Sequence, residues 1–255
     1  MIPLVHHRKM RTIILVASLI ALAAFLFKWL TKSNALWQIM ITQCLPNQRA
    51  SQHPAPCAKV DETAGFVVLK DRVGPLQYLL MPIDKITGME DPILLNPGTP
   101  NFLALAWQQR HFMSDKLGRP IADNDISLAV NSKYGRTQNQ LHIHVSCIRP
   151  DVKSRLSDLR PAPTEGWSHV PGGLLGHDYL VRRMSETELQ QREAFQLLVD
   201  EVEGARGNMA YFGLAMTSLP EGDFLLLATE FDPLRLNFAS PEELQDHHCD
   251  VLAPK

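Results

Sequence analysis

Hydrophobic and polar residues alternate without a break from Gln140 to Cys147. The apolar positions are Leu141, Ile143, Val145 and Cys147, and the polar positions are Gln140, His142, His144 and Ser146. Because successive side chains of a strand point to opposite faces, this pattern predicts a strand with one core-facing side. Its polar side then carries two imidazoles about 7 Å apart. A turn-rich segment that contains Gly135 leads into this strand.

The remaining pattern predicts short strands and amphipathic helices. Strands are expected over 65–70, 76–81, 126–130, 179–183, 211–217 and 224–229. Helices are expected over 34–44, 100–116, 187–206 and 241–249, with a loop over 47–56 and a loop with a short helix over 154–170. The order strand, strand, helix, strand, strand is typical of an α+β fold. The second half repeats strand, helix and two strands without paired histidines, so we interpret it as a degenerate half-repeat that completes one sheet.

An apolar run lies near the N-terminus. Residues 1–11 carry basic side chains, and the run Thr12–Leu30 follows, with Lys28 and Trp29 near its end. A spanning helix needs about 20 apolar residues, and Lys and Trp suit its interfacial end. The alternative is a cleaved signal peptide, but the run lacks small residues where cleavage would occur. We therefore expect a cytoplasmic tail (1–11), one transmembrane signal anchor (12–30) and one external domain (31–255).

Composition narrows the chemistry further. The formal net charge of −2 and the sequence pI near 6.5 give no basic bias, so nucleic-acid binding has no support. The four cysteines form an even set, which in an exported domain predicts two disulfides with three possible pairings. We favour Cys44–Cys57 and Cys147–Cys249. A free, core-facing Cys147 is the alternative for a cytosolic domain, and the spacing does not resemble a zinc site.

Three interpretations of the paired imidazoles compete. The pair could be a surface feature without a function. It could hold a metal, although the same strand offers no further ligand. It could carry phosphorus chemistry, in which one imidazole attacks a phosphate. The preceding polar loop would then hold the phosphate oxygens with Asn131, Thr137 and backbone N–H groups.

The segment from Asn131 through Gly135-Arg-Thr-Gln-Asn-Gln-Leu-His-Ile-His-Val145 resembles the signature of the histidine triad superfamily of nucleotidyl hydrolases and transferases. More closely, the chain is similar to the bacterial membrane-bound CDP-diacylglycerol pyrophosphatases from about Cys44 to Cys249. Further segments that carry this resemblance are Cys44-Leu-Pro-Asn47, Gly74-Pro-Leu-Gln-Tyr-Leu-Leu-Met-Pro82, Ser146-Cys-Ile-Arg-Pro-Asp-Val152 and Pro171-Gly-Gly-Leu174.

The resemblance implies a histidine-triad-like antiparallel sheet with packed helices. It also implies hydrolysis of CDP-diacylglycerol to CMP and phosphatidate in phospholipid metabolism, without metal or cofactor. The implied location is the bacterial inner membrane, crossed once, with the catalytic domain on the periplasmic side and the membrane as a partner. Alternatives are a hydrolase or transferase of the same superfamily acting on another nucleotide, or a non-catalytic membrane-tethered nucleotide or lipid binder. The oligomeric state stays open.

The same resemblance assigns roles to individual residues. His142 is the expected nucleophile, and His144 is expected to hydrogen-bond the phosphate oxygens. Gln140 stands where the family pattern has its first histidine, so it can support the site but cannot titrate. Arg136 is a candidate for the second phosphate, weighed against a solvated loop arginine. These assignments require an exposed His142 ring with room for a diphosphate beside it, and a buried ring or the lack of that room would overturn them.

The other histidines have plainer interpretations. His247 and His248 are expected on the surface of the last helix, and a structural role is favoured for His177.

Overall fold

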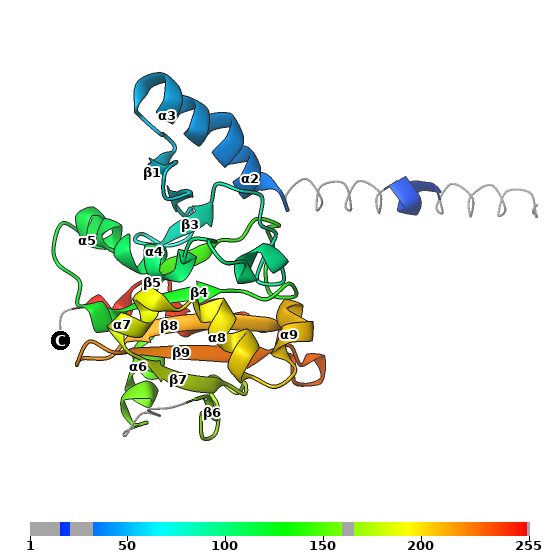
Figure 1. The fold of residues 1–255 in the computed structure, drawn as a ribbon, viewed down its shortest axis with the longest axis vertical. Coiled ribbons are helices and arrows are strands. Elements are labelled where there is room, and N and C mark those ends of the chain that lie inside the picture. The colour runs from blue at the N-terminus through cyan, green and yellow to red at the C-terminus, as the bar shows by residue number, and fades with distance from the viewer. Residues whose placement is uncertain (1–15, 21–32, 160–165, 254–255) are drawn as a thin grey trace, which may run out of the picture.

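An antiparallel sheet forms the body of the computed structural model, which describes residues 16–20, 33–159 and 166–253 (Figure 1). The ten strands follow the order β1-β2-β3-β5-β4-β8-β9-β7-β6, and β10 pairs with β5. The strands are β1 Cys57–Asp61, β2 Phe66–Lys70, β3 Tyr78–Pro82, β4 Ile126–Val130, β5 Ile143–Ile148, β6 Ser168–His169, β7 Leu180–Met184, β8 Phe212–Ser218, β9 Phe224–Glu230 and β10 Gln245–Asp246.

Short helices connect and cover these strands. The α-helices are α2 Ala35–Ile39, α3 Leu45–Ser51, α4 Phe102–Gln108, α5 His111–Leu117, α6 Pro150–Ser157, α7 Glu186–Gln191, α8 Ala194–Glu201 and α9 Ala205–Asn208. A π-helical turn, η1 Met40–Cys44, joins α2 to α3. The 3-10 turns are η2 Pro92–Leu95, η3 Asp123–Asp125, η4 Met209–Tyr211, η5 Pro233–Arg235, η6 Pro241–Leu244 and η7 Asp250–Leu252.

One face of the sheet packs against α4 and α8. The apolar set predicted for the central strand (Ile143, Val145 and Cys147) lies in this core together with Phe102 of α4 and Phe195 of α8. Figure 1 shows α7 and α8 lying across β8 and β9. Burial of alternate apolar side chains therefore orients the strands and leaves the polar set of β5 on the opposite face.

The two halves of the sheet have the same order of elements. In the first half, β3, α4, β4 and β5 follow one another, and in the second half β7, α8, β8 and β9 do so. The halves meet where β4 pairs with β8. One row of laterally paired residues crosses the sheet on the face away from α4 and α8: Leu79, His144, Ala129, Ala215, Leu227 and Val181. His144 and Leu227 thus occupy matching positions in the two halves.

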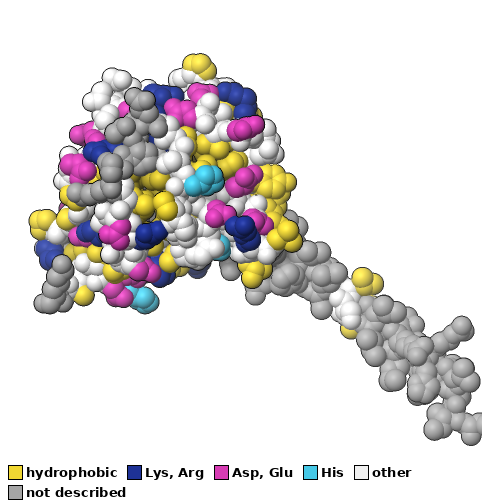
Figure 2. All heavy atoms as spheres, turned by 90° about the horizontal axis from the view of Figure 1, so that it is seen from below, with side chains coloured by type: hydrophobic (Ala, Val, Ile, Leu, Met, Phe, Trp, Pro, Cys, Tyr) yellow, Lys and Arg dark blue, Asp and Glu magenta, His cyan; other side chains and the backbone are white. Residues whose placement is uncertain are grey.

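The opposite face has separate covers. The segment α2–η1–α3 packs over Val67 and Met81 of β2 and β3. Helix α6 packs over Val181 and Leu227 of β7 and β9. The chain after β9, through η6 and β10, lies over β5. The segment that contains η6 and β10 therefore encloses the polar side chains of β5. On the face shown in Figure 2, acidic and basic side chains are interspersed.

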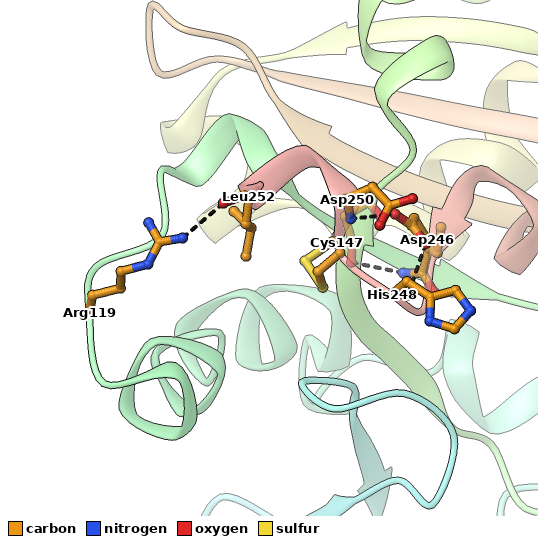
Figure 3. Close-up of a disulfide and its surroundings, with 9 residues drawn as sticks. Arg119, Cys147, Asp246, His248, Asp250 and Leu252 are labelled. Carbon is orange, nitrogen blue, oxygen red and sulfur yellow. Dashed lines mark hydrogen bonds between the residues drawn. A yellow bond between two sulfur atoms is a disulfide. The ribbon is translucent and has the colours of Figure 1, made fainter. Parts of the chain in front are cut away.

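Both favoured disulfides are formed, Cys44–Cys57 and Cys147–Cys249. Figure 3 shows how the C-terminal segment is fixed around the second one: Arg119 donates to the carbonyl of Leu252, and the Asp246 carboxylate accepts from the backbone N–H of Asp250. This disulfide joins β5 to the segment that covers it.

The prediction of a transmembrane helix is not supported. Across the described ranges, no helix is long and apolar enough to cross a bilayer. Within the expected anchor, residues 16–20 are helical, and the rest of 12–30 lies outside the described residues, as does the tail 1–11. The fold class is therefore corrected to a mixed α/β body with an antiparallel sheet.

Other expectations are also corrected. The helix expected over 241–249 is wrong, because Gln245 and Asp246 pair with β5 and Cys249 is held in its disulfide. The loop expected over 47–56 begins too early, since α3 continues to Ser51. The helix over 100–116 divides into α4 and α5 where Arg110 hydrogen-bonds the carbonyl of Trp107. The helix over 187–206 divides likewise, with Glu193 capping the start of α8.

Candidate active site

The paired histidines lie at the start of β5 and are buried. The strand begins at Ile143, so Gln140, which lies in a bend, and His142 precede it. Gln140 is 0% exposed, His142 7% and His144 5%. The expectation of an exposed His142 ring is therefore wrong. Alternation along the strand identified the polar face, but it could not reveal the segment that covers that face.

One hydrogen bond fixes the tautomer of His142. Its Nδ1 lies 2.6 Å from the backbone carbonyl oxygen of Gln140. Because a carbonyl oxygen only accepts hydrogen bonds, Nδ1 carries the proton and Nε2 carries the lone pair. Nε2 has no hydrogen-bond partner in the described chain and is not among its fully buried polar atoms. Nε2 is thus the ring nitrogen whose lone pair is left without a partner among the described residues.

The surroundings of His142 keep the ring neutral. Burial and, to a lesser extent, the neighbouring His144 lower the pKa of His142 to about 4, against opposing effects of the Gln140 carbonyl and Glu242. The two rings meet edge to face with centroids 4.9 Å apart. An uncharged ring with a free Nε2 is the form of imidazole that can attack phosphorus.

His144 has the opposite tautomer. Its Nδ1 lies 3.2 Å from Nε2 of Gln77, and this amide nitrogen also donates to the carboxylate of Asp71. Because the amide nitrogen donates, Nδ1 of His144 accepts and Nε2 carries the proton. That Nε2 lies 3.4 Å from Oε2 of Glu242, at ion-pair distance but without hydrogen-bond geometry. Burial lowers the pKa of His144, although Glu242 opposes the shift. A buried N–H donor is therefore left free for another acceptor.

Glu242 links the covering segment to the histidines. Its carboxylate accepts a 2.9 Å hydrogen bond from Nδ2 of Asn131 and lies 3.4 Å from Nε2 of His247. Burial alone would raise the pKa of Glu242, but His144 and Asn131 outweigh burial and lower it. Sequence reasoning missed both Glu242 and His247, because each falls in the helix wrongly expected over 241–249. No local pattern marks either residue, since their role depends on a contact with β5.

The other predicted binding residues differ in burial and in their hydrogen-bond partners. Asn131 is buried, and its side-chain oxygen accepts from the backbone N–H of Glu242. The side chain of Thr137 is exposed on the loop. Gln140 donates to the backbone carbonyls of Pro82 and Asp84, which anchors the start of the strand.

Arg136 is buried in a bidentate ion pair with Glu90, so it is not a solvated loop residue. A Cβ at Gly88 would lie 2.4 Å from the Arg136 guanidinium, so only glycine leaves room for this ion pair. The guanidinium also contributes to lowering the pKa of His142, which places its charge within reach of the site.

Several buried polar atoms around the polar side chains of β5 have no hydrogen-bond partner among the described residues. They are Oε1 of Gln77, Gln140 and Gln245, Oγ of Ser127 and Ser146, Nε2 of His144 and Nδ1 of His247. Buried polar atoms are normally paired, so such a cluster indicates water or a polar ligand in the functional state. Within the described parts of the chain, no group of three or more His, Cys, Asp or Glu side chains is placed to hold a metal ion.

A cavity of about 650 Å³ lies elsewhere, at the ends of β7 and β9. Its lining includes Trp167, His177 and Phe231, but neither His142 nor His144. His177 is held there by the carboxylate of Glu243, consistent with the structural role expected for it. The room for a diphosphate beside His142 that the sequence interpretation required is thus not open in this conformation.

A neutral, oriented imidazole lies beside a second imidazole and a carboxylate on an antiparallel sheet, an arrangement that fits a hydrolase. A family model described as CDP-diacylglycerol pyrophosphatase matches residues 31–253. A protein of Yersinia pestis named CDP-diacylglycerol pyrophosphatase is 55% identical over 236 residues, which cover 92% of each chain. The chain therefore belongs to the CDP-diacylglycerol pyrophosphatase family, as the sequence resemblance indicated.

Proposed function

We propose that the chain hydrolyses CDP-diacylglycerol to CMP and phosphatidate, with Nε2 of His142 as the nucleophile of a histidine-triad-type reaction. The overall activity follows from membership of the family. The observation that supports the nucleophile is the hydrogen bond from Nδ1 of His142 to the Gln140 carbonyl, which leaves the lone pair on Nε2. The enzyme acts in phospholipid metabolism.

The reaction proceeds in two displacements. Nε2 attacks the phosphorus that bears the cytidine, the bond from this phosphorus to the bridging oxygen breaks, and phosphatidate leaves with the electron pair. Water then attacks the same phosphorus and loses a proton to solvent, the phosphorus–nitrogen bond breaks with its electron pair returning to Nε2, and CMP leaves. The Nδ1 proton stays on the ring while Nε2 is bonded to phosphorus, which makes the imidazole a good leaving group. Splitting the displacement lowers each barrier.

The neighbouring side chains bind and orient the diphosphate. The free Nε2–H of His144 donates to a phosphoryl oxygen. Thr137 reaches the phosphate from the loop, and the ion pair of Arg136 with Glu90 holds that loop in place. Asn131 acts mainly by holding Glu242, and Gln140 holds the loop through Pro82 and Asp84. These roles replace the direct phosphate contacts expected of Asn131 and Arg136.

Access to His142 requires a movement of its cover. The ring is 7% exposed, and the segment that lies over the neighbouring His144 carries Glu242 and His247. Glu242 contacts Asn131, which follows β4, and His144 of β5, and a phosphate can replace these contacts. Substrate binding is thus expected to shift this segment while the Cys147–Cys249 disulfide keeps it attached.

The two disulfides indicate that the domain lies in an oxidising compartment, because the reducing cytosol keeps most cysteines as free thiols. We place the catalytic domain, residues 31–255, on the periplasmic side of a bacterial inner membrane. There it meets its substrate as a lipid of the membrane. The reaction requires neither a nucleic acid nor a metal, since the imidazole is itself the nucleophile.

The test is to trap the intermediate. Substrate labelled at the cytidine phosphate is mixed with the enzyme, quenched within one turnover, and the labelled peptide is mapped. Label on His142 is expected, and it should disappear in His142→Asn but persist in His248→Asn, which changes an exposed histidine. Label on another residue, or full turnover by His142→Asn, would contradict the assignment. Faster release of AMP from a dinucleotide than of CMP from CDP-diacylglycerol would instead favour another nucleotide as substrate.

A further inference from the structure

A loop close to the candidate site exposes large apolar side chains. Leu234 is 95% exposed, Leu236 72% and Phe238 50%. The loop is closed by a bridge between Asp232 and Asn237, and the Asp232 carboxylate accepts from the backbone N–H of Leu234. Hydrogen bonds, and not burial of its apolar side chains, therefore hold the loop in shape.

Aromatic rings extend the apolar surface beyond the loop. Tyr134 stacks on Phe231 with centroids 4.2 Å apart, and Tyr211 lies 5.1 Å from Tyr134. Tyr134 and Tyr211 are 41% and 37% exposed. We call this surface the apolar rim; it comprises Tyr134, Tyr211, Phe231, Leu234, Leu236 and Phe238. Figure 2 shows hydrophobic side chains exposed among acidic and basic ones on the face drawn.

The apolar rim is continuous with the candidate site. Ser132, next to Asn131, donates from its backbone N–H to the carbonyl of Ala239 and from its hydroxyl to the carbonyl of Phe238. A Cβ at Gly135 would lie 2.9 Å from the Phe238 carbonyl oxygen, so the two loops are in close contact there. The rim loop then continues directly into η6, which contains Glu242. A partner that binds the apolar rim therefore lies next to the loop 131–139 and to the start of the segment that carries Glu242.

The backbone and the charges of the rim favour an apolar partner. Leu236 has a φ of 56°, a left-handed conformation that leucine rarely adopts. Its side chain is held toward solvent, and exposed apolar patches of this kind commonly mark interaction surfaces. Arg235, the cation of the loop, is paired with Asp178 and Asp232. Within the described loop 231–239, no cation is therefore left unpaired for an anionic surface.

We propose that the apolar rim inserts into the surface of the phospholipid bilayer that carries the substrate. This inference rests on the proposed function. The two acyl chains of CDP-diacylglycerol remain in the hydrocarbon, because exposing their methylenes to water is unfavourable. Leucine and phenylalanine of the rim enter the same layer, and tyrosine suits its interface. The diphosphate at the headgroup level then reaches the loop 131–139 and His142.

The test compares two forms of the substrate. The full chain is reconstituted in phosphatidylcholine vesicles, and hydrolysis of long-chain CDP-diacylglycerol in the bilayer is compared with that of a short-chain, monomeric analogue. The variant is Leu234→Gln with Leu236→Asn, since asparagine tolerates the left-handed conformation. Its rate on the bilayer substrate is expected to fall about tenfold or more, while its rate on the monomeric analogue stays within about twofold of the parent.

A matched control comes from Leu175, which is 40% exposed and also left-handed, with a φ of 52°, in a different turn. Leu175→Asn should leave both rates unchanged. Hydrogen exchange of peptides covering 231–239 should slow when vesicles are added, and the parent's bilayer-to-monomer ratio should be insensitive to salt, because Arg235 is already paired.

Specific results would overturn the proposal. An equal fall on both substrates would mean that the loop acts on the site and not on lipid, and an unchanged bilayer rate would exclude insertion. Self-association of the parent that the double variant abolishes, with an unchanged bilayer rate, would make the rim a contact between copies of the chain. If the parent cleaves neither substrate, the proposed function fails. Slower hydrogen exchange over 231–239 on addition of vesicles would still support insertion of the apolar rim into the bilayer.

Discussion

The two halves of the sheet share one order of elements but differ in the chemistry of one face. On that face, the chain of the first half presents His142, His144 and Ser146 at and just before β5, whereas β9 of the second half presents Leu225, Leu227 and Thr229. Lateral pairing places His144 and Leu227 at matching positions on either side of β4 and β8. The same backbone therefore supports a polar row or an apolar one, and the candidate site depends on side chains and not on topology.

The covers differ in the same way. Leu225 and Leu227 pack with Val152 and Leu156 of α6, so this half is sealed by burial of apolar surface. His144 is enclosed by Gln77 and Glu242, and polar atoms around it lack partners in the described chain. One half thus contributes stability, and the other carries polar groups whose burial lowers stability unless a ligand satisfies them.

The largest contrast is expected from placing asparagine at matching positions. His142→Asn should reduce hydrolysis of CDP-diacylglycerol on the order of 10³-fold or more, because the nucleophile is gone, while the protein stays folded. Leu225→Asn should instead lower the free energy of unfolding by roughly 2–5 kcal/mol, because it removes apolar contacts and buries an unpaired amide. Steady-state rates and denaturant unfolding of both variants check this. Similar activity losses in the two folded variants would erase the contrast.

The disulfides provide the next contrast. The cysteines of the Cys147–Cys249 bond are 102 residues apart, and those of the Cys44–Cys57 bond are 13 apart. Loop-closure entropy predicts a loss of about 4–5 kcal/mol on replacing the first pair by serine and about 3 kcal/mol for the second. Replacing the first pair should also lower activity, because β10 and the segment with Glu242 are freed from β5. Thermal unfolding and rates of the two double variants test this, and equal activity in both would contradict it.

Adjacent carboxylates allow a finer comparison. Glu242 faces His144 in the first half, whereas Glu243 accepts a hydrogen bond from the hydroxyl of Tyr179 in the second. Glu242→Gln should lower kcat roughly 10- to 100-fold, because Asn131 and His144 lose the charge that orients them. Glu243→Gln is the matched control, and its effect should appear in stability and not in kcat. A loss of kcat as large in Glu243→Gln would show that the effect is not specific to the site.

Part of the fold and of the candidate site could be predicted from the sequence. Alternation located β4 and the face of β5, and the even set of cysteines, taken with the favoured pairing, agreed with the disulfides that are formed. These features depend on local spacing. The burial of His142 and the role of Glu242 depend on a segment about 100 residues later in the chain, which alternation cannot place. The helix expected over 241–249 failed for the same reason, since pairing with β5 overrides local helix preference.

The smallest expected effect, in pH dependence, tests the burial itself. Burial and the neighbouring His144 lower the pKa of His142 to about 4. Attack needs the neutral ring, so kcat/KM should hold below pH 6.5, the usual pKa of an exposed imidazole, and be halved only near pH 4.

The same shift acts on stability. Between about pH 4 and 6.5 the unfolded chain binds a proton at residue 142 that the folded chain does not, so the free energy of unfolding falls as pH falls through this window. His142→Asn should reduce that slope, because residue 142 then no longer titrates. Unfolding free energies measured across the window in the parent and the variant check the sign. A midpoint of kcat/KM near 6.5 with identical slopes would mean that the ring meets water in solution, and the polar half of the sheet would then be open where the apolar half is closed.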